Sequence, residues 1–582
     1  MSLLLTTETG TIHKKWKGFL PVALIYPNTY PVAVSNLGFQ LIYHQLNSLD
    51  FIVCERFVYP SQAGPLRSLE SNRLLSDFPV VMFSISFEND YPNLISLLNA
   101  GLASTLATSR DSSITPGSPL IIGGGVAIFM NPEPLAPFCD LMVMGEAEAI
   151  VPELMLQVDN AINHGHSREK LCNEIGTGLD GCYAPSFYSF HYGNNDHLSE
   201  IRAKDNLPLR INRVIQDNPD QSAHSRLLSP DAELSMFMTE LGRGCSRGCR
   251  FCAAGFIYRP PRLWSSDAII KSLDERPAEI KRIGLLGMEM ASNQVLDTIS
   301  DYLRDNNCAL SFSSLRADRI SPALLSLLRD SSLKSAAIAP DGCSQRLRSV
   351  INKGLNEDDL INAAVRLVEA GIMHLKLYVM IGLPTESIDD LDELLSMLKR
   401  LQNAIHPLGR KRGRLCEITL SVNSFSPKPW TPFQYLSFGG FTSESHQEEL
   451  TTKYLVGTLK EKIKYLRKQL KKTKNIRLKV DRPEHVLQQA IFARGDRRLA
   501  PVLMDMALSN MPLKKSLHRH GLSHRQFIRP RKKEENFSWD IVDHGISKEY
   551  LWKEYQKALR EGFTPPCDTS RCRACGVCNE KK

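Results

Sequence analysis

The stretch Leu241–Arg262, LGRGCSRGCRFCAAGFIYRPPR, places Cys245, Cys249 and Cys252 in a C-x3-C-x2-C pattern. Thiolates bind zinc and iron–sulfur clusters, so three in one short loop indicate a metal centre. A structural zinc ion needs four ligands, and a zinc knuckle here would require a remote fourth one. A four-iron cluster held by three thiolates instead leaves one iron open to another ligand, which favours a reactive centre.

Glycine and arginine alternate with the cysteines of this loop. Glycine lets the chain turn tightly around a bulky group, and arginine offsets the negative charge of a thiolate-bound cluster. Phe251 would shield such a cluster from water. The residues concerned are Gly242, Gly244, Gly248, Arg243, Arg247 and Arg250.

Length and composition indicate a large globular protein. The chain has 582 residues, of which 42% are hydrophobic and 23% charged, and these values exclude general disorder. At roughly 100–200 residues per domain, we expect about two to four domains. The formal charge of +8 permits a nucleic-acid or phosphate-bearing partner without requiring one. Neither a long apolar run nor a secretory signal is found, so we predict a cytoplasmic protein without a membrane partner.

The 14 cysteines fall into two tight groups and seven scattered positions. In a reducing compartment a scattered cysteine behaves as a small buried apolar residue, whereas a group indicates a metal. The scattered ones are Cys54, Cys139, Cys172, Cys182, Cys308, Cys343 and Cys416.

The first part of the chain alternates strand and helix patterns, which is typical of a parallel sheet. We therefore predict an α/β fold in which residues 1–185 form a Rossmann-like, doubly wound parallel sheet. Residues 186–230 are polar and irregular and predict a linker with one hairpin. The segments that carry the pattern are Pro21–Leu46, Phe78–Phe87, Asn93–Ser104, Ser118–Phe129 and Cys139–Met155.

Strand and helix patterns resume after the cysteine loop. Residues 231–441 are predicted to form a partial (β/α) TIM-type barrel, and residues 442–582 a basic, mainly helical region. The predicted barrel strands are Arg282–Glu289, Ala309–Leu315, Ser335–Gly342, His374–Pro384 and Cys416–Pro427.

A C-x3-C-x-aromatic-C pattern in the first loop of a β/α barrel resembles the radical S-adenosylmethionine (SAM) superfamily. GCSRGCRFCAAGFIYRPPR is similar to a subgroup of large bacterial radical SAM proteins with an N-terminal cobalamin-binding-like domain and a C-terminal cysteine cluster. The resemblance extends over nearly the whole chain. It implies a [4Fe-4S] cluster on Cys245, Cys249 and Cys252 that binds SAM and cleaves it reductively to methionine and a 5′-deoxyadenosyl radical.

The resemblance also implies residues that contact SAM. Gly287 and Met288 end a strand whose backbone would contact the methionine amine. Ser314 and Arg316 end the next strand, where Arg316 would pair with the methionine carboxylate or else bridge barrel loops.

Two further segments would contact the nucleoside part of SAM. Asp341 stands where many relatives have glutamate, and its shorter side chain puts a direct ribose contact in doubt. Ser344 and Arg346 are the alternates for that contact. Ile381 and Gly382 lie in LYVMIGLPTE, which looks like the adenine-contacting strand. No catalytic residue is singled out.

The N-terminal segment IIGGGVAIFMNPEPLAPFCDLMVMGEAEA resembles the end of a cobalamin domain. Gly123, Gly124 and Gly125 would let the backbone approach a flat cofactor, and Gly145-Glu146 would open a helix after the neighbouring strand. The chain has no D-x-H-x-x-G, so no histidine is offered to cobalt. Bound cobalamin and an empty scaffold are both open, because any α/β sheet has glycines at its strand ends.

Cys567, Cys572, Cys575 and Cys578 form a second group, C-x4-C-x2-C-x2-C. Four close thiols predict a second iron–sulfur cluster or a zinc ion. Such a centre would donate sulfur, relay electrons, anchor substrate or be purely structural.

The basic stretches Gly409–Arg414 and Lys460–Lys474 form a solvated surface or bind RNA. The main hypothesis is a radical SAM enzyme that transfers a methyl or methylthio group, supplied with electrons by flavodoxin or ferredoxin. The alternative is a non-catalytic iron–sulfur redox sensor or nucleic-acid-binding regulator.

Overall fold

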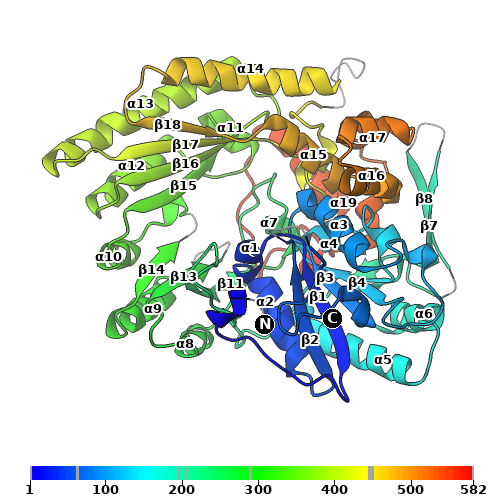
Figure 1. The fold of residues 1–582 in the computed structure, drawn as a ribbon. Coiled ribbons are helices and arrows are strands. Elements are labelled where there is room, and N and C mark those ends of the chain that lie inside the picture. The colour runs from blue at the N-terminus through cyan, green and yellow to red at the C-terminus, as the bar shows by residue number, and fades with distance from the viewer. Residues whose placement is uncertain are drawn as a thin grey trace.

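A computed structural model describes residues 3–60, 64–193, 197–204, 206–287, 292–312, 315–442 and 451–579. The two predicted α/β halves lie side by side, and helices of the C-terminal region pack against both halves (Figure 1). No described helix combines the length and apolar character of a membrane span.

The N-terminal half is a six-stranded sheet of order β2-β1-β3-β4-β5-β6, parallel except for the antiparallel edge strand β6. Its strands are almost completely buried, as expected for a sheet covered on both faces. The elements are β1 (Leu20–Tyr26), β2 (Ile52–Val58), β3 (Val80–Ser84), β4 (Leu120–Gly124), β5 (Leu141–Val143), β6 (Cys182–Tyr183), α1 (Tyr30–Val34), α2 (Leu37–Ser48), α3 (Tyr91–Gly101), α4 (Val126–Met130), α5 (Val151–Asn163) and α6 (Arg168–Gly178).

The connecting segment contains the predicted hairpin, β7 (Tyr188–Tyr192) with β8 (Leu198–Ala203). A short strand, β9 (Ile211–Asn212), pairs in parallel with β19 (Val542–Asp543). The segment that connects the two halves is therefore paired with the C-terminal region.

The second half is an open barrel of parallel strands in two sheets, β10-β13-β14 and β15-β16-β17-β18, joined by a bridge between Leu315 and Ile338. The predicted barrel class is confirmed. The elements are β10 (Phe237–Glu240), β11 (Gly242–Arg243), α7 (Ala254–Ile257), β12 (Arg262–Leu263), α8 (Ser266–Asp274), β13 (Arg282–Leu286), α9 (Asn293–Asp305), β14 (Ala309–Phe312), α10 (Pro322–Asp330), β15 (Ser335–Asp341), α11 (Gln345–Val350), α12 (Glu357–Glu369), β16 (His374–Ile381), α13 (Ile388–Lys411) and β17 (Glu417–Ser424).

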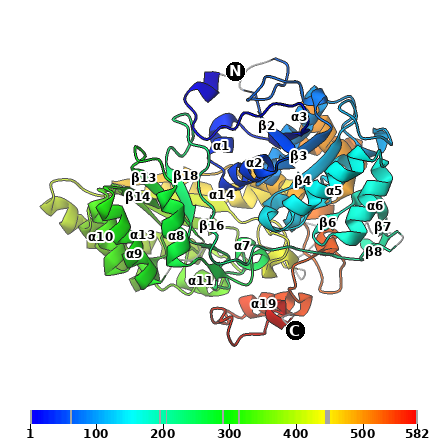
Figure 2. The same cartoon turned by 90° about the horizontal axis from the view of Figure 1, so that it is seen from below.

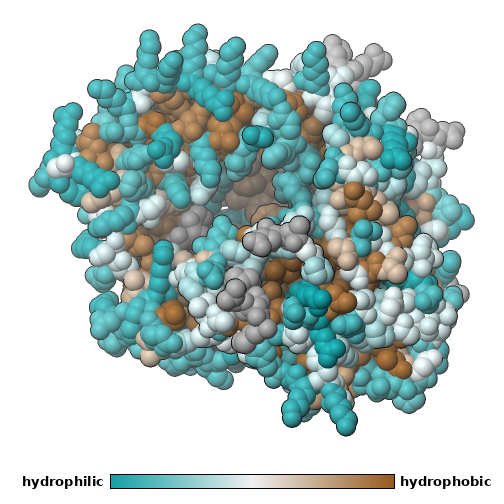
Figure 3. Space-filling model, in the orientation of Figure 1, coloured by the Kyte–Doolittle hydropathy of each residue, from teal (hydrophilic) through white to brown (hydrophobic). Residues whose placement is uncertain are grey.

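The barrel sheet continues beyond residue 441, where the sequence places its end. The basic helix α14 (Thr452–Leu470) leads into β18 (Ile476–Val480), which pairs in parallel with β17. The apolar side chains Leu455, Leu459 and Leu466 of α14 are buried, while the surface over this helix is polar (Figure 3). The helix is therefore an amphipathic cover of the barrel.

The remaining helices belong to both halves. They are α15 (Pro483–Ala493), α16 (Ala500–Ser509), α17 (Leu513–Arg519), α18 (His524–Ile528) and α19 (Lys548–Leu559). Helix α16 packs on α3 of the N-terminal sheet, whereas α19 packs on α11 of the barrel. Helix α19 and the C-terminus lie at one edge of the molecule (Figure 2, red).

Candidate functional site

The cysteine loop begins directly after the first barrel strand, β10. It is closed at its base by the antiparallel pairing of Gly242–Arg243 with Arg262–Leu263. Gly242 (φ +154°) and Gly244 (φ +84°) have no room for a side chain, because a Cβ atom would lie 2.3 Å from the Arg262 oxygen and 2.5 Å from the Tyr258 oxygen. These two predicted glycines therefore set the path of the loop.

The three thiols of the loop lie in a buried, cation-rich setting. Burial raises the pKa of Cys252 to about 12, and the nearby thiols of Cys249 and Cys245 act in the same direction. Burial also raises the pKa of Cys249, against the lowering effect of three cations around it. These cations are Lys353, Arg316 and Arg247. They would stabilise thiolates once a metal displaced the protons.

This donor set fits a four-iron cluster. The thiols of Cys245, Cys249 and Cys252 are close enough to interact with one another, and three cations act on Cys249. In a cubane each thiolate binds a different iron, so the ligands surround the cluster instead of converging. Three close thiols with nearby cations are therefore a donor set that fits a four-iron cluster.

Asp341 and Lys353 form a buried ion pair beside the cysteine loop. Lys353 Nζ lies 2.5 Å from the Asp341 carboxylate, and Asp341 has a left-handed backbone (φ +59°) at the end of β15. Arg316 Nη2 donates to the Lys353 carbonyl at 2.6 Å, and its Nε lies 2.7 Å from Asp318. Two predicted cofactor residues, Asp341 and Arg316, thus lie together near Cys249. The contacts of Arg316 bridge barrel loops, which is the alternative role that the sequence left open for this residue.

A cavity of about 440 Å³ lies between the two halves. It lies at the carboxyl ends of β1, β3, β4 and β5, where a sheet of order 2-1-3-4-5 binds ligands. Its barrel side is formed by the end of β10, the base of the cysteine loop, Tyr258 and Gly287. The predicted residues Gly123, Gly124, Gly125 and Gly287 therefore line one space, although they come from different halves.

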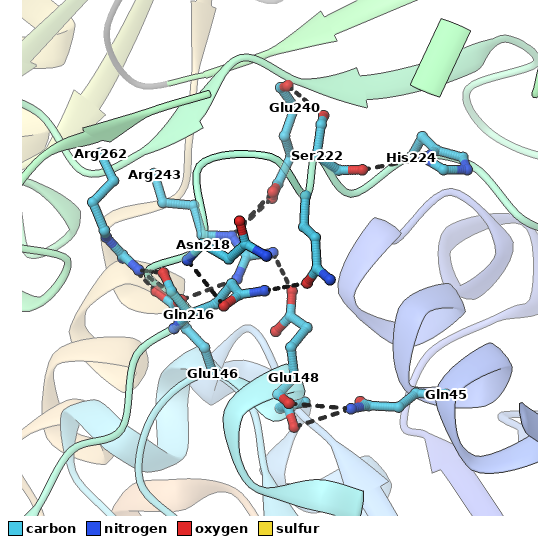
Figure 4. A network of polar contacts seen from close by, with 12 residues as sticks. Gln45, Glu146, Glu148, Gln216, Asn218, Ser222, His224, Glu240, Arg243 and Arg262 are labelled. Carbon is cyan, nitrogen blue, oxygen red and sulfur yellow. Dashed lines mark hydrogen bonds and ion pairs between the residues drawn. The ribbon is translucent and has the colours of Figure 1, made fainter. Parts of the chain in front are cut away.

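A network of carboxylates and arginines lines the polar wall of this cavity (Figure 4). Arg243 lies 3.0 Å from Glu240, 3.1 Å from Glu146 and 2.6 Å from Glu148. Arg262 contacts Glu146 at 2.6 Å. Burial raises the pKa of Glu240 to about 7, and the charges of Glu148 and Glu146 add to this effect, whereas Arg243 opposes it. Glu240 can therefore hold or release a proton near neutral pH.

Comparison with protein families identifies the chain. Residues 38–185 match the model "Radical SAM proteins, N-terminal", and residues 239–398 match the model of the radical SAM superfamily. Together the two models span more than half of the sequence. The chain belongs to the radical SAM superfamily. The family implies a [4Fe-4S] cluster and SAM, in agreement with the cysteine loop.

Relatives of this radical SAM protein are distant. The uncharacterized protein MJ0966 of Methanocaldococcus jannaschii is 28% identical over 484 residues, which cover 83% of this chain and 90% of that protein. Among solved structures, cobalamin-dependent OxsB is 14% identical, with a TM-score of 0.48 and coverage of 93% of this chain and 80% of its own. The methyltransferase TsrM of Kitasatospora setae is 12% identical, with a TM-score of 0.44 and coverage of 71% and 75%.

Some predicted contacts of the radical SAM site require correction. Ser344 is fully buried and caps α11, where its hydroxyl accepts from Leu347 N and donates to Asp390 at 2.5 Å. It is therefore not available to a ribose. Arg346 instead contacts Asp390 and Thr385. Met288 and Ser314 lie outside the described residues.

Ile381 and Gly382 have packing roles. Ile381 is completely buried. A Cβ atom on Gly382 (φ +78°) would lie 2.7 Å from the side chain of Leu459 on α14, and Gly382 N donates to Glu386 at 3.0 Å. Position 382 therefore requires glycine because α14 packs closely against it.

The three N-terminal glycines also differ in role. A Cβ atom on Gly123 would lie 2.6 Å from the Phe83 ring, and one on Gly125 (φ +105°) would lie 2.5 Å from the Ile85 oxygen. A Cβ atom on Gly124 would lie 3.8 Å from its nearest neighbour, the Phe83 oxygen, which is an ordinary van der Waals distance. Packing thus explains two of these glycines, and only Gly124 leaves space toward the cavity.

Replacing Glu240 with glutamine is expected to flatten the pH dependence of stability. Folded Glu240 has a pKa of about 7, against 4.5 for an ordinary glutamate. Its protonated form therefore contributes stability that is complete below about pH 4.5 and lost as the pH rises through about 7. At about pH 8 the variant should be more stable by on the order of 1–2 kcal/mol, a value reduced because the side chain is partly exposed.

Thermal unfolding of the Glu240→Gln variant across this pH range tests the prediction. The exposed Glu279→Gln variant is the control and should keep the wild-type slope. The same slope in both variants would contradict the assignment.

Proposed function

We propose that this radical SAM protein is an enzyme that acts on an organic substrate bound in the cavity between the two halves. The observation that supports this is the shared lining, because the base of the cysteine loop and Gly287 face the strand ends of the N-terminal sheet across one space. When bound, the cluster on Cys245, Cys249 and Cys252 and its SAM would supply reductive cleavage of the S–C5′ bond and a hydrogen-abstracting radical.

The residues of the chain would bind, orient and protect the reactants. Leu24, Met82, Ile122 and Val143 give the cavity an apolar wall that excludes water from a reactive radical. Arg243 and Arg262 hold Glu146 in place by ion pairs, so the polar wall is preorganised. Glu240 would exchange a proton with a substrate near neutral pH.

Methyl transfer is the reaction that we propose within this class. Gly124 leaves room for a flat group at the end of β4, which is compatible with cobalamin, whereas the cavity lining contains no histidine among the described residues to bind cobalt. When bound, cobalamin would supply the methyl-transfer chemistry, and the backbone at Gly124 would face its ring. Methylthio transfer is less favoured, because none of the described C-terminal cysteines lines the cavity.

The experiment is anaerobic reconstitution with iron and sulfide, reduction with dithionite, and assay of 5′-deoxyadenosine. Formation of the nucleoside by fully loaded protein supports the proposal, and its absence favours the non-catalytic regulator. A cobalt count on purified protein, with transfer of a labelled methyl group from SAM, tests methyl transfer separately.

Filling the cavity at Gly124 is expected to block substrate without unfolding the protein. Gly124→Leu places a side chain where van der Waals space exists, so KM for substrate should rise at least about tenfold, and cobalt bound to the purified protein should fall. Gly123→Leu is the comparison, and should instead lower the melting temperature, because its side chain meets the Phe83 ring. Substrate kinetics and thermal unfolding check both, and an unchanged KM in the Gly124 variant would exclude this cavity as the binding site.

A further inference from the structure

The C-terminal cysteine segment lies directly against the cysteine loop of the barrel. Cys567 N donates to the carbonyl of Ser246 at 2.6 Å, and Ser246 follows Cys245. One hydrogen bond and one peptide separate the two groups, so the Cα atoms of Cys245 and Cys567 lie within about 11 Å. Two cysteine groups far apart in sequence are thus neighbours in space.

The segment is fastened to the loop by buried polar contacts. Arg250, between Cys249 and Cys252, is completely buried and donates to Gly562 O at 2.6 Å and to Glu554 at 3.2 Å. Asn352 Nδ2 donates to Gly248 O at 3.2 Å and to Thr564 O at 3.0 Å. The side chains of Arg250 and Asn352 therefore fix the distance between the two cysteine groups.

The four C-terminal thiols are close to one another. Burial raises the pKa of Cys567 to about 11; Arg259 opposes this, and the thiols of Cys572, Cys575 and Cys578 add to it. Arg259, which follows the cysteine loop, hydrogen-bonds the Cys575 thiol and the Tyr550 hydroxyl. The same arginine thus connects the two cysteine groups and places a positive charge between them.

One side of the C-terminal segment faces solvent. Residues 568–571 are exposed, as are Arg573 and Phe563, the latter with 69% of its surface. Arg560, Arg571 and Arg573 are exposed along this segment, and they outnumber its exposed acidic residues, Glu561 and Asp568. The cavity lies elsewhere, because none of its lining residues comes from the described part of this segment. A centre on these cysteines would therefore be accessible to another protein rather than to the substrate.

We propose that Cys567, Cys572, Cys575 and Cys578 hold a second iron–sulfur cluster that passes electrons from an acidic one-electron carrier protein to the cluster of the barrel loop. This proposal rests on the proposed function and specifies its electron supply. One electron leaves the reduced carrier, reduces the C-terminal cluster, and then moves to the barrel cluster. No bond forms or breaks, and the carrier ends one electron more oxidised. The exposed arginines of the segment complement the charge of the carrier.

The test measures reduction of the barrel cluster by two reductants in the full-length protein. Wild type and a Cys572→Ser/Cys578→Ser variant are reconstituted anaerobically, analysed for iron and zinc, and mixed with reduced flavodoxin or with dithionite. Absorbance and electron paramagnetic resonance follow the clusters. We expect the variant to lose about half of its iron and to be reduced by flavodoxin at least tenfold more slowly, whereas dithionite, a small molecule, still reduces the barrel cluster.

A charge variant tests the docking surface without removing a ligand. Arg571→Glu/Arg573→Glu should slow reduction by flavodoxin about tenfold at low salt, and the difference should shrink at high salt. Lys471→Glu/Lys472→Glu on the segment after α14 changes the charge equally and should have no effect. Zinc without iron at the C-terminal site, or equal flavodoxin rates in wild type and the cysteine variant, would overturn the proposal. Failure of wild type to cleave SAM with dithionite would instead count against the proposed function.

Discussion

Replacing Cys249 with alanine is expected to abolish SAM cleavage. Cys249 is the partly buried middle ligand of the loop, and its loss leaves two thiols for a cluster that needs three. Formation of 5′-deoxyadenosine should fall by more than about three orders of magnitude, because the whole reaction depends on the cluster. The measurement is nucleoside formation with dithionite, together with iron content and the absorbance of the reduced and oxidised protein.

A matched cysteine variant separates ligand loss from general damage. Cys308, in the turn before β14, belongs to neither cysteine group and is partly buried like Cys249. Cys308→Ala should retain iron and activity. If Cys249→Ala also retained its cluster and its redox behaviour, the assignment of the loop would be wrong.

The cluster ligands could be predicted because their chemistry is local. Three thiols within eight residues need no tertiary information, and the glycines beside them report the tight path of the loop. Lys353 was not predicted, because it reaches the cysteine loop from the turn after α11. Glu240 carried a weak signal, a carboxylate at a strand end just before the loop, but its partners come from other segments of the chain.

The fold was predictable where apolar runs mark the strands. All five predicted barrel strands are present, but β2 was not predicted, because Glu55 and Arg56 interrupt its apolar pattern. Both side chains are nevertheless buried, and Arg56 lies 2.6 Å from Glu70 and also contacts Glu8. A buried charge is tolerated only with such partners. The partners are distant in the sequence, so the pattern of apolar residues around β2 does not reveal them.

Replacing Arg250 with alanine is expected to release the C-terminal segment from the cysteine loop. The side chain is fully buried against Glu554, of which only 2% is exposed, so its removal leaves this carboxylate with Lys557 as its ion-pair partner and Thr564 as a hydroxyl donor. Breaking a buried pair costs about 3–5 kcal/mol when the remaining charge has no partner, and Lys557 lowers the cost here. In a chain of 582 residues this loss should appear first as local opening. Hydrogen exchange and limited proteolysis of residues 560–579 should therefore increase before the rest of the protein unfolds.

A double-mutant cycle identifies the cause of that opening. Arg250→Ala/Glu554→Gln should be less damaging than the sum of the single changes, because the interaction between Arg250 and Glu554 is counted in both single variants and is lost only once. The exposed Arg560→Ala variant should stay within about 0.5 kcal/mol of wild type. Because Arg250 lies between two ligands of the barrel cluster, opening of the segment should also slow reduction by flavodoxin while dithionite still reduces that cluster. Strict additivity in the cycle would mean that Arg250 acts through its carbonyl contacts alone, and that the pair with Glu554 does not hold the two cysteine groups together.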